Sequence, residues 1–156
     1  MTSFVVKALQ KEELSIFSKL SDRELANRSA QWIRADTNPG YPCRVSLVDA
    51  EVGERVLAFS FCHHDVNSPY RSAGPIFIRE KAETARLKIN HIPKMLRHRL
   101  LSIRAYGSDN MMIGAEVLEG VDLEDGIDRL FESDKVEFLH IHNANPGCFN
   151  CAVYRA

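Results

Sequence analysis

The order of hydrophobic and polar positions predicts a chain built mainly of short strands. Apolar residues alternate with polar ones, or form short runs bounded by turn residues, along most of the sequence. We expect strands at residues 4–9, 30–35, 44–48, 55–62, 75–79, 100–106, 111–118, 136–142 and 149–154. Strands 44–48 and 55–62 are expected to join across a turn at Gly53, and strands 100–106 and 111–118 around the turn 107–110.

Fewer segments have the spacing of helices. Residues 11–28 are loosely helical, with a break and an N-cap expected at Ser21 and Asp22. A short helical turn is expected at 93–96, and the helix 122–132 begins with acidic residues that the helix dipole favours. The pattern predicts an α+β fold, mainly an antiparallel sheet with two or three helices packed on one face. No repeat or Pro/Gly/Ser-rich linker divides the chain, so residues 1–156 are expected to form a single globular domain.

Composition narrows the class of protein without naming an activity. The 156 residues are 45% hydrophobic and 26% charged, with a net charge of −1, as in soluble globular proteins. The N-terminal residues lack the pattern of a signal peptide, and no apolar stretch approaches the ~20 residues that span a membrane. Four cysteines without an export signal are typical of reduced thiols. We therefore expect a cytoplasmic protein with no membrane partner.

Charge is unevenly distributed along the chain. Residues 79–104 hold eight Lys or Arg against two Glu, a balance of +6, whereas residues 116–137 hold two basic against nine acidic residues, a balance of −7. Such asymmetry is typical of solvated faces that balance each other, or of a field that orients a ligand. Pro93 interrupts the basic segment and no aromatic residue accompanies it, so nucleic-acid binding is not expected.

The stretch 140–151 gathers two imidazoles and two thiols, those of His140, His142, Cys148 and Cys151. Because side chains on a strand repeat with period two, His140 and His142 are expected on one face. A hairpin closed by residues 143–147 that pairs His142 with Cys148 adds Cys148 to that face and turns Cys151 away. All four are candidate ligands for zinc or another transition metal, provided that the segment bends to bring them together.

The same residues allow two interpretations without a metal. A histidine beside a thiol activates it as a nucleophile, which makes His140, His142 and Cys148 candidate catalytic residues. Alternatively, the stretch is a structural hairpin with buried thiols and hydrogen-bonded polar groups. A thioredoxin-like motif is disfavoured because a strand, not a helix, follows the cysteines. A zinc deaminase is excluded because that class needs His-x-Glu well upstream.

Two further clusters are candidates for binding. The polar loop 68–74 carries Tyr70 and Arg71, and Arg104 lies on a nearby predicted strand, so these three are candidate ligands for a small anion. A plain turn with surface arginines is the alternative. His63 and His64 are adjacent and are expected to face opposite ways on a strand. One of them could join His140 and His142 across strands; otherwise they mark a polar strand end.

Four ordered blocks of the sequence, residues 40–57, 68–80, 100–117 and 138–156, resemble a family of small bacterial proteins catalogued as a domain of unknown function, DUF1203. The resemblance covers roughly residues 20–156 and implies no activity. Relatives often carry a second cysteine three residues after the one at Cys43, where this chain has Ser46. A four-cysteine site with Cys148 and Cys151 is therefore incomplete here. The sequence predicts a metal-binding or small-anion-binding protein, or an enzyme that uses the C-terminal hairpin. The alternative is a non-catalytic binding or interaction domain in which these residues are structural, and the oligomeric state is not predicted.

Overall fold

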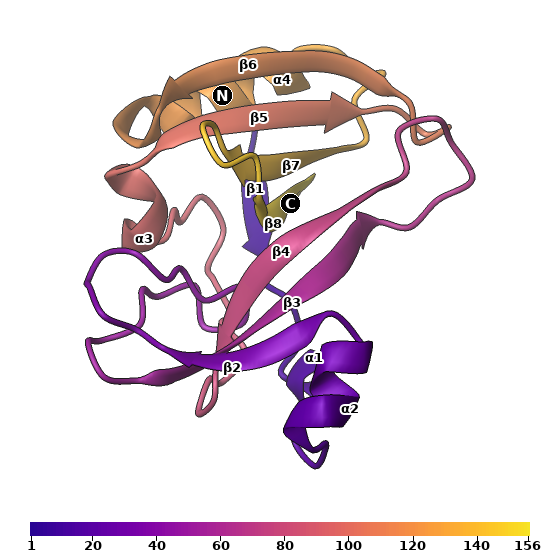
Figure 1. The fold of residues 1–156 in the computed structure, drawn as a ribbon. Helices are drawn as coiled ribbons and strands as arrows, with labels where there is room; N and C mark the ends of the chain where they lie inside the picture. The colour runs from indigo at the N-terminus through magenta and orange to yellow at the C-terminus, as the bar shows by residue number, and fades with distance from the viewer.

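The computed structural model describes residues 1–156 and contains two antiparallel sheets (Figure 1). The large sheet has the order β1 (Phe4–Lys7), β8 (Phe149–Arg155), β7 (Phe138–Asn143), β5 (Leu100–Tyr106) and β6 (Met112–Glu119). The small sheet has the order β2 (Ala30–Arg34), β3 (Arg55–His64) and β4 (Ser72–Arg79). The predicted α+β class is confirmed, and so is the hairpin of β5 and β6.

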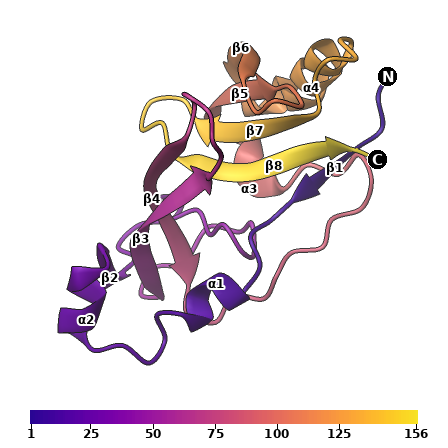
Figure 2. The same cartoon turned by 90° about the vertical axis from the view of Figure 1, so that its right-hand side faces the viewer.

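The helices differ in number and placement from the expected two or three on one face. There are four short α-helices, α1 (Glu12–Ser15), α2 (Asp22–Asn27), α3 (Lys94–Arg97) and α4 (Leu123–Phe131), and the 3₁₀ turn η1 (Gly120–Asp122). In Figure 2, α1 and α2 lie beside the small sheet and α4 beside the large one, and α4 contacts β5 and β6. No helix is long and apolar enough to cross a membrane.

The N-cap expected at Ser21 is confirmed. The Ser21 hydroxyl accepts from the backbone N–H of Glu24 at 3.2 Å, and the Glu24 carboxylate accepts from the Ser21 N–H at 2.7 Å. This reciprocal capping box starts α2 and separates it from α1. The loosely helical segment 11–28 is therefore two short helices instead of one.

The predicted strand 44–48 is wrong. This segment is a tight turn flanked by isolated bridges at Pro42, Cys43 and Asp49, and Leu47 takes the left-handed backbone conformation with φ 53°. Its backbone is held from several directions: the Arg44 N–H donates to Phe77 and the Val45 carbonyl accepts from Ala85. The apolar residues suggested a strand, but Val45 and Leu47 are buried because the rest of the fold encloses the loop, and Val48 is exposed.

One face of the large sheet forms the main core. Leu101, Ile103, Leu139 and Ile141 of this face belong to the same buried cluster as residues of α4. The opposite face of β7 carries histidines and is covered by the end of β3, as the ring contacts between these strands show. Figure 2 shows β3 and β4 running past the ends of β7 and β8. The histidines of β7 therefore lie where the two sheets meet.

Candidate functional site

Four histidines from two strands meet between the sheets. His140 and His142 of β7 project from the face opposite the main core, as the strand period predicts, with ring centres 6.2 Å apart. The His63 ring of β3 lies 4.8 Å from the ring of His142 and 6.0 Å from that of His140. The His64 ring lies 5.5 Å from that of His140. Of the two alternatives for His63 and His64, the structure has the one in which a histidine of β3 lies against His140 and His142, and both His63 and His64 do so.

Both histidines of β3 reach this cluster because the strand is irregular. The pairing of β3 with β4 shifts register between Phe61 and His64. A bulge of this kind changes the direction in which successive side chains point. The expectation that His63 and His64 face opposite ways is therefore wrong.

Three imidazoles of the cluster, those of His63, His140 and His142, favour the neutral form because they are wholly or partly withdrawn from water. Burial lowers the pKa of His63 to about 4 and, with the charge of neighbouring imidazoles or of Arg104, lowers the pKa values of His140 and His142 to about 3. His142 Nδ1 bonds the Gly147 carbonyl at 2.8 Å. By contrast, Nε2 of His63, Nδ1 of His140 and Nε2 of His142 are buried without a hydrogen-bond partner.

The four metal-ligand candidates from the sequence do not converge. Cys151 pairs with Ile141 and is fully buried in the main core, on the other face of β7, as the strand period predicts. Burial raises the pKa of its thiol to about 12. No group of three or more His, Cys, Asp or Glu side chains has the arrangement that would hold a metal ion.

Cys148 lies apart from the histidine face. The expected pairing of His142 with Cys148 is wrong, because a register shift pairs His142 with Phe149. The turn instead bonds the Asn143 N–H to the Cys148 carbonyl at 2.9 Å, and Gly147 takes the positive φ of 81° that closes it. The Cys148 sulfur accepts from Asn143 Nδ2 at 3.2 Å. Cys148 therefore lies beside Asn143, not beside an imidazole.

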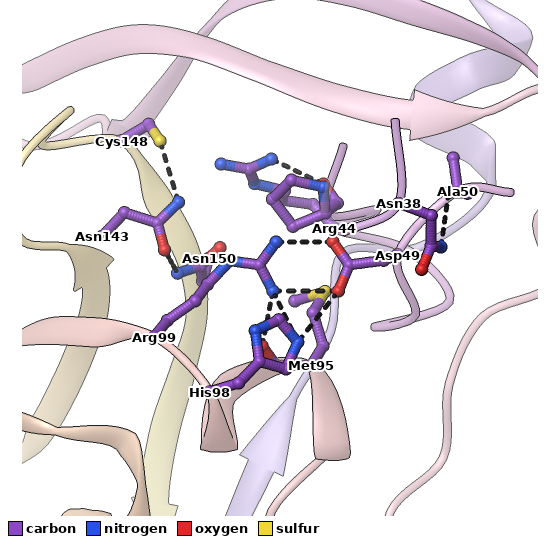
Figure 3. A network of polar contacts seen from close by, with 11 residues as sticks. Asn38, Arg44, Asp49, Ala50, Met95, His98, Arg99, Asn143, Cys148 and Asn150 are labelled. Carbon is purple, nitrogen blue, oxygen red and sulfur yellow. Dashed lines mark hydrogen bonds and ion pairs between the residues drawn. The ribbon is translucent and has the colours of Figure 1, made fainter. Parts of the chain in front are cut away.

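Cys148 opens instead into a pocket of about 430 Å³ between the C-terminal hairpin and the loop that follows β2. Its polar lining comes from Arg44, Arg99, Asn143, Asn145 and Cys148, and no Asp or Glu lines it. Figure 3 shows Arg44 and Asn143 in one region of polar contacts, with Cys148 bonded to Asn143. The sequence blocks that contain Cys43 and Cys148, far apart in the chain, both line this pocket, together with Pro75 and Phe77 of β4 and the segment at Arg99 and Leu100.

Arg44 is the unusual member of the pocket because its charge has no partner. Its side chain is 0% exposed, and it donates from Nε to the Phe149 carbonyl at 2.7 Å and from Nη1 to the Pro42 carbonyl at 2.5 Å. Its Nη2 is buried with no partner. Burial lowers the pKa of Arg44, although a charge on Cys148 acts against that shift. A guanidinium nonetheless stays protonated in proteins.

The second arginine of the pocket has a compensated charge. Arg99 donates to both carboxylate oxygens of Asp49, at 2.9 and 2.5 Å, and to the Met95 carbonyl (Figure 3). Asp49 is 9% exposed, so this ion pair is largely withdrawn from water. A buried carboxylate thus neutralises Arg99 and leaves Arg44 as the uncompensated cation.

The residues that the sequence predicted to bind an anion do not include Arg44. Arg71 is exposed and pairs with Asp65 at 3.1 Å, and Tyr70 is 38% exposed. Arg104 lies on β5 opposite His140, where its charge contributes to the lowered pKa of the histidines. Sequence reasoning missed Arg44, Asn143 and Asn150. The available signal was a single arginine within the apolar run 43–48.

One protein-family model matches a part of the chain that contains the whole site. The family model described as a protein of unknown function (DUF1203) matches residues 40–155. The chain belongs to the DUF1203 family. The part that matches the DUF1203 model includes the entire pocket around Arg44 and all four histidines of the cluster, and it excludes β1, α1, α2 and β2. No curated protein and no solved structure matches the chain.

Proposed function

We propose that this protein binds a small carboxylate or phosphate ion, or a molecule that bears one, in the pocket lined by Arg44. The observation that carries the proposal is the Arg44 guanidinium, which is 0% exposed, lacks a carboxylate partner and keeps Nη2 free of hydrogen bonds. A pocket of about 430 Å³ is large enough for a small ligand.

Electrostatics favour an anion over other ligands. A buried charge is costly unless a counter-charge and hydrogen bonds compensate it. Two carbonyl oxygens solvate Arg44 in part, but no carboxylate lines the pocket. Nη2 is covered in this structure, so a bound anion would accept from it after a small displacement of the covering atoms, and would supply the missing negative charge. A charge-assisted hydrogen bond of this kind contributes ~1.5–3 kcal/mol.

The test is binding of acetate and inorganic phosphate at constant ionic strength, measured by calorimetry and by the anion-dependent rise in melting temperature. We expect Arg44→Met to raise the dissociation constant at least ~10-fold, which corresponds to ~1.4 kcal/mol. Arg44→Lys keeps the positive charge but loses the hydrogen bonds to the Phe149 and Pro42 carbonyls. It serves as a second variant if Arg44→Met does not fold. Circular dichroism checks that both variants fold.

Matched variants locate the site. Arg71→Met and Arg104→Met remove the arginines that the sequence favoured, and neither should change binding by more than about twofold, or ~0.4 kcal/mol. Loss of binding in Arg104→Met with normal binding in a folded Arg44→Met would place the anion at the Tyr70, Arg71 and Arg104 set instead. Binding unchanged in every variant would overturn the proposal.

A second candidate function is transition-metal binding by His63, His140 and His142, although their present arrangement is not that of a metal site. It is favoured by their three buried imidazole nitrogens without partners. The Gly147 carbonyl fixes one nitrogen of His142 as a donor and leaves the other free, as is usual for metal-bound histidines. Imidazoles that share one zinc ion have ring centres ~5 Å apart, so the observed 4.8–6.2 Å separations require rotation and approach of the rings.

Metal analysis of protein purified without a histidine tag tests this second candidate. About one equivalent of zinc, nickel or copper is expected, lost in His142→Gln and kept in His98→Gln, whose histidine lies outside the cluster. Less than about 0.2 equivalents in the unsubstituted protein would contradict metal binding. The four free cysteines also support a reducing, cytoplasmic setting for either function.

A further inference from the structure

The Arg44 pocket holds a thiol whose surroundings suit a nucleophile. The Asn143 amide is oriented by its neighbour, because Asn150 Nδ2 donates to Asn143 Oδ1 at 2.8 Å. Asn150 is fully buried, so this contact is shielded from water. With its oxygen engaged, Asn143 presents its Nδ2 donor to the Cys148 sulfur at 3.2 Å. A donor aimed at sulfur favours the thiolate, which is the reactive form.

Arg44 provides the second influence on this sulfur. Arg44 and Cys148 line the same pocket, and a charge on Cys148 acts against the lowering of the Arg44 pKa that burial causes. Cys148 is partly exposed along the pocket, so a reagent can reach it. The pocket thus places a reachable thiol beside a buried cation that has no fixed counter-ion.

The other three thiols lack this combination. The Cys43 sulfur is fully buried and accepts from the backbone N–H groups of Ser46 and Arg79. Cys151 lies in the main core. Cys62 on β3 is partly exposed but does not line the pocket. Cys62 therefore serves as an internal reference for an ordinary accessible thiol.

We propose that Cys148 is a nucleophile for small carboxylates that carry an electrophilic carbon, and that Arg44 holds the carboxylate during attack. This inference rests on the anion binding proposed above and adds a covalent step. The Cys148 proton passes to solvent, the thiolate attacks the carbon next to the carboxylate, and an S–C bond forms. The bond from that carbon to the leaving group breaks, and the leaving group departs with the electron pair.

The test compares iodoacetate with iodoacetamide, which differ in charge but share the reacting carbon and the iodide leaving group. Rates at Cys148 and Cys62 are measured by mass spectrometry of their peptides. We expect the ratio of the iodoacetate rate to the iodoacetamide rate to be at least ~10-fold higher at Cys148, since ~1.4 kcal/mol of preferential binding gives tenfold. Acetate should slow the reaction of iodoacetate at Cys148 and leave that at Cys62 unchanged.

Variants separate recognition of the carboxylate from activation of the thiol. Arg44→Met should bring the Cys148 ratio down to that of Cys62. Asn143→Leu, which removes the donor to sulfur, should slow both reagents at Cys148 and keep the ratio. A Cys148 ratio equal to that of Cys62 in the unsubstituted protein would overturn the inference, as would a ratio unchanged in a folded Arg44→Met.

The two proposals fail in distinguishable ways. Arg44-dependent binding of acetate together with no preference for iodoacetate at Cys148 would defeat the covalent step and leave anion binding standing. No acetate binding and no iodoacetate preference would defeat both. Rapid reaction of Cys148 with both reagents at a ratio equal to that of Cys62 would show an activated thiol without a carboxylate site, which also contradicts the inference.

Discussion

The four cysteines show how position in the fold divides residues of one type into different chemical classes. All four are free thiols. Cys43 and Cys151 are fully buried, whereas Cys62 and Cys148 are partly exposed. Burial disfavours the thiolate and raises the pKa of Cys151 to about 12, although the charge of Arg44 acts against that shift. Cys148 differs because it is partly exposed at an open pocket that Arg44 also lines.

Thiol labelling should reproduce this division. In the native protein at pH 8, we expect a neutral disulfide reagent to modify Cys62 and Cys148 and to leave Cys43 and Cys151 unmodified, because the buried pair is inaccessible. Peptide mapping identifies the modified thiols, and labelling in urea confirms that all four are then available. Modification of Cys151 in the folded protein as rapid as that of Cys62 would contradict the core position assigned to it.

At the level of elements, the connection between β6 and α4 depends on one close approach. Gly120 follows β6 directly and bonds its N–H to the Arg99 carbonyl at 2.8 Å, where the chain passes the end of α3. A Cβ atom at this position would lie 1.8 Å from the Leu96 carbonyl oxygen. The obstructing atom belongs to the backbone, so it cannot move aside as a flexible side chain would.

Gly120→Ala should therefore destabilise the protein by ~3 kcal/mol or more, because α3 and the turn η1 must separate. The free energy of unfolding from urea titration measures the effect. Gly74→Ala is the matched control, since no atom lies within 4 Å of a Cβ added there, and its effect should stay within ~1 kcal/mol. Equal stabilities for the two variants would show that α3 does not hold this position.

At the level of the whole molecule, the two sheets meet through the buried histidine cluster. His63 belongs to the small sheet and His140 and His142 to the large one, and Phe149 stacks on the His63 ring with centres 5.4 Å apart. Charging any of these rings would place a cation in a buried contact between sheets. The free energy of unfolding therefore depends on whether these rings are protonated.

Stability should fall as the medium is acidified. Burial holds the pKa of His140 and His142 at about 3, below the ~6.5 of the unfolded chain, so the unfolded state binds more protons as the pH falls. Their contribution is complete above ~6.5 and is lost as the pH falls toward ~3. Between pH 7 and pH 5 we expect a loss of ~1–2 kcal/mol for each of these two histidines.

Urea titrations at both pH values in the presence of EDTA measure this loss. His140→Gln removes one titrating ring and should reduce the pH dependence. His91→Gln replaces an exposed histidine and should leave the pH dependence as it is. A free energy of unfolding that is equal at pH 7 and pH 5 would contradict the burial of neutral imidazoles between the sheets.

Local sequence patterns were sufficient for most of the individual elements. The period of two placed His140 and His142 of β7 on one face of the sheet and Cys151 of β8 on the other, because alternation is a property of any extended chain. The capping residues at Ser21 marked the start of α2, since a cap bonds backbone only three residues away. Turn residues likewise predicted the hairpin of β5 and β6.

Tertiary structure alone decided which of these elements meet. The bulges in β3 and β8 shifted the register, turned His63 and His64 toward one cluster and removed Cys148 from the histidine face. Residues 44–48 became a turn because contacts from distant segments enclose them, and this buried Arg44 against Cys148, more than one hundred positions away. The sequence by itself determined which way neighbouring side chains point along a strand, and which residues were candidates for binding or catalysis. Long-range packing determined which cation, which thiol and which imidazoles became neighbours, because those contacts depend on parts of the chain that no local pattern connects.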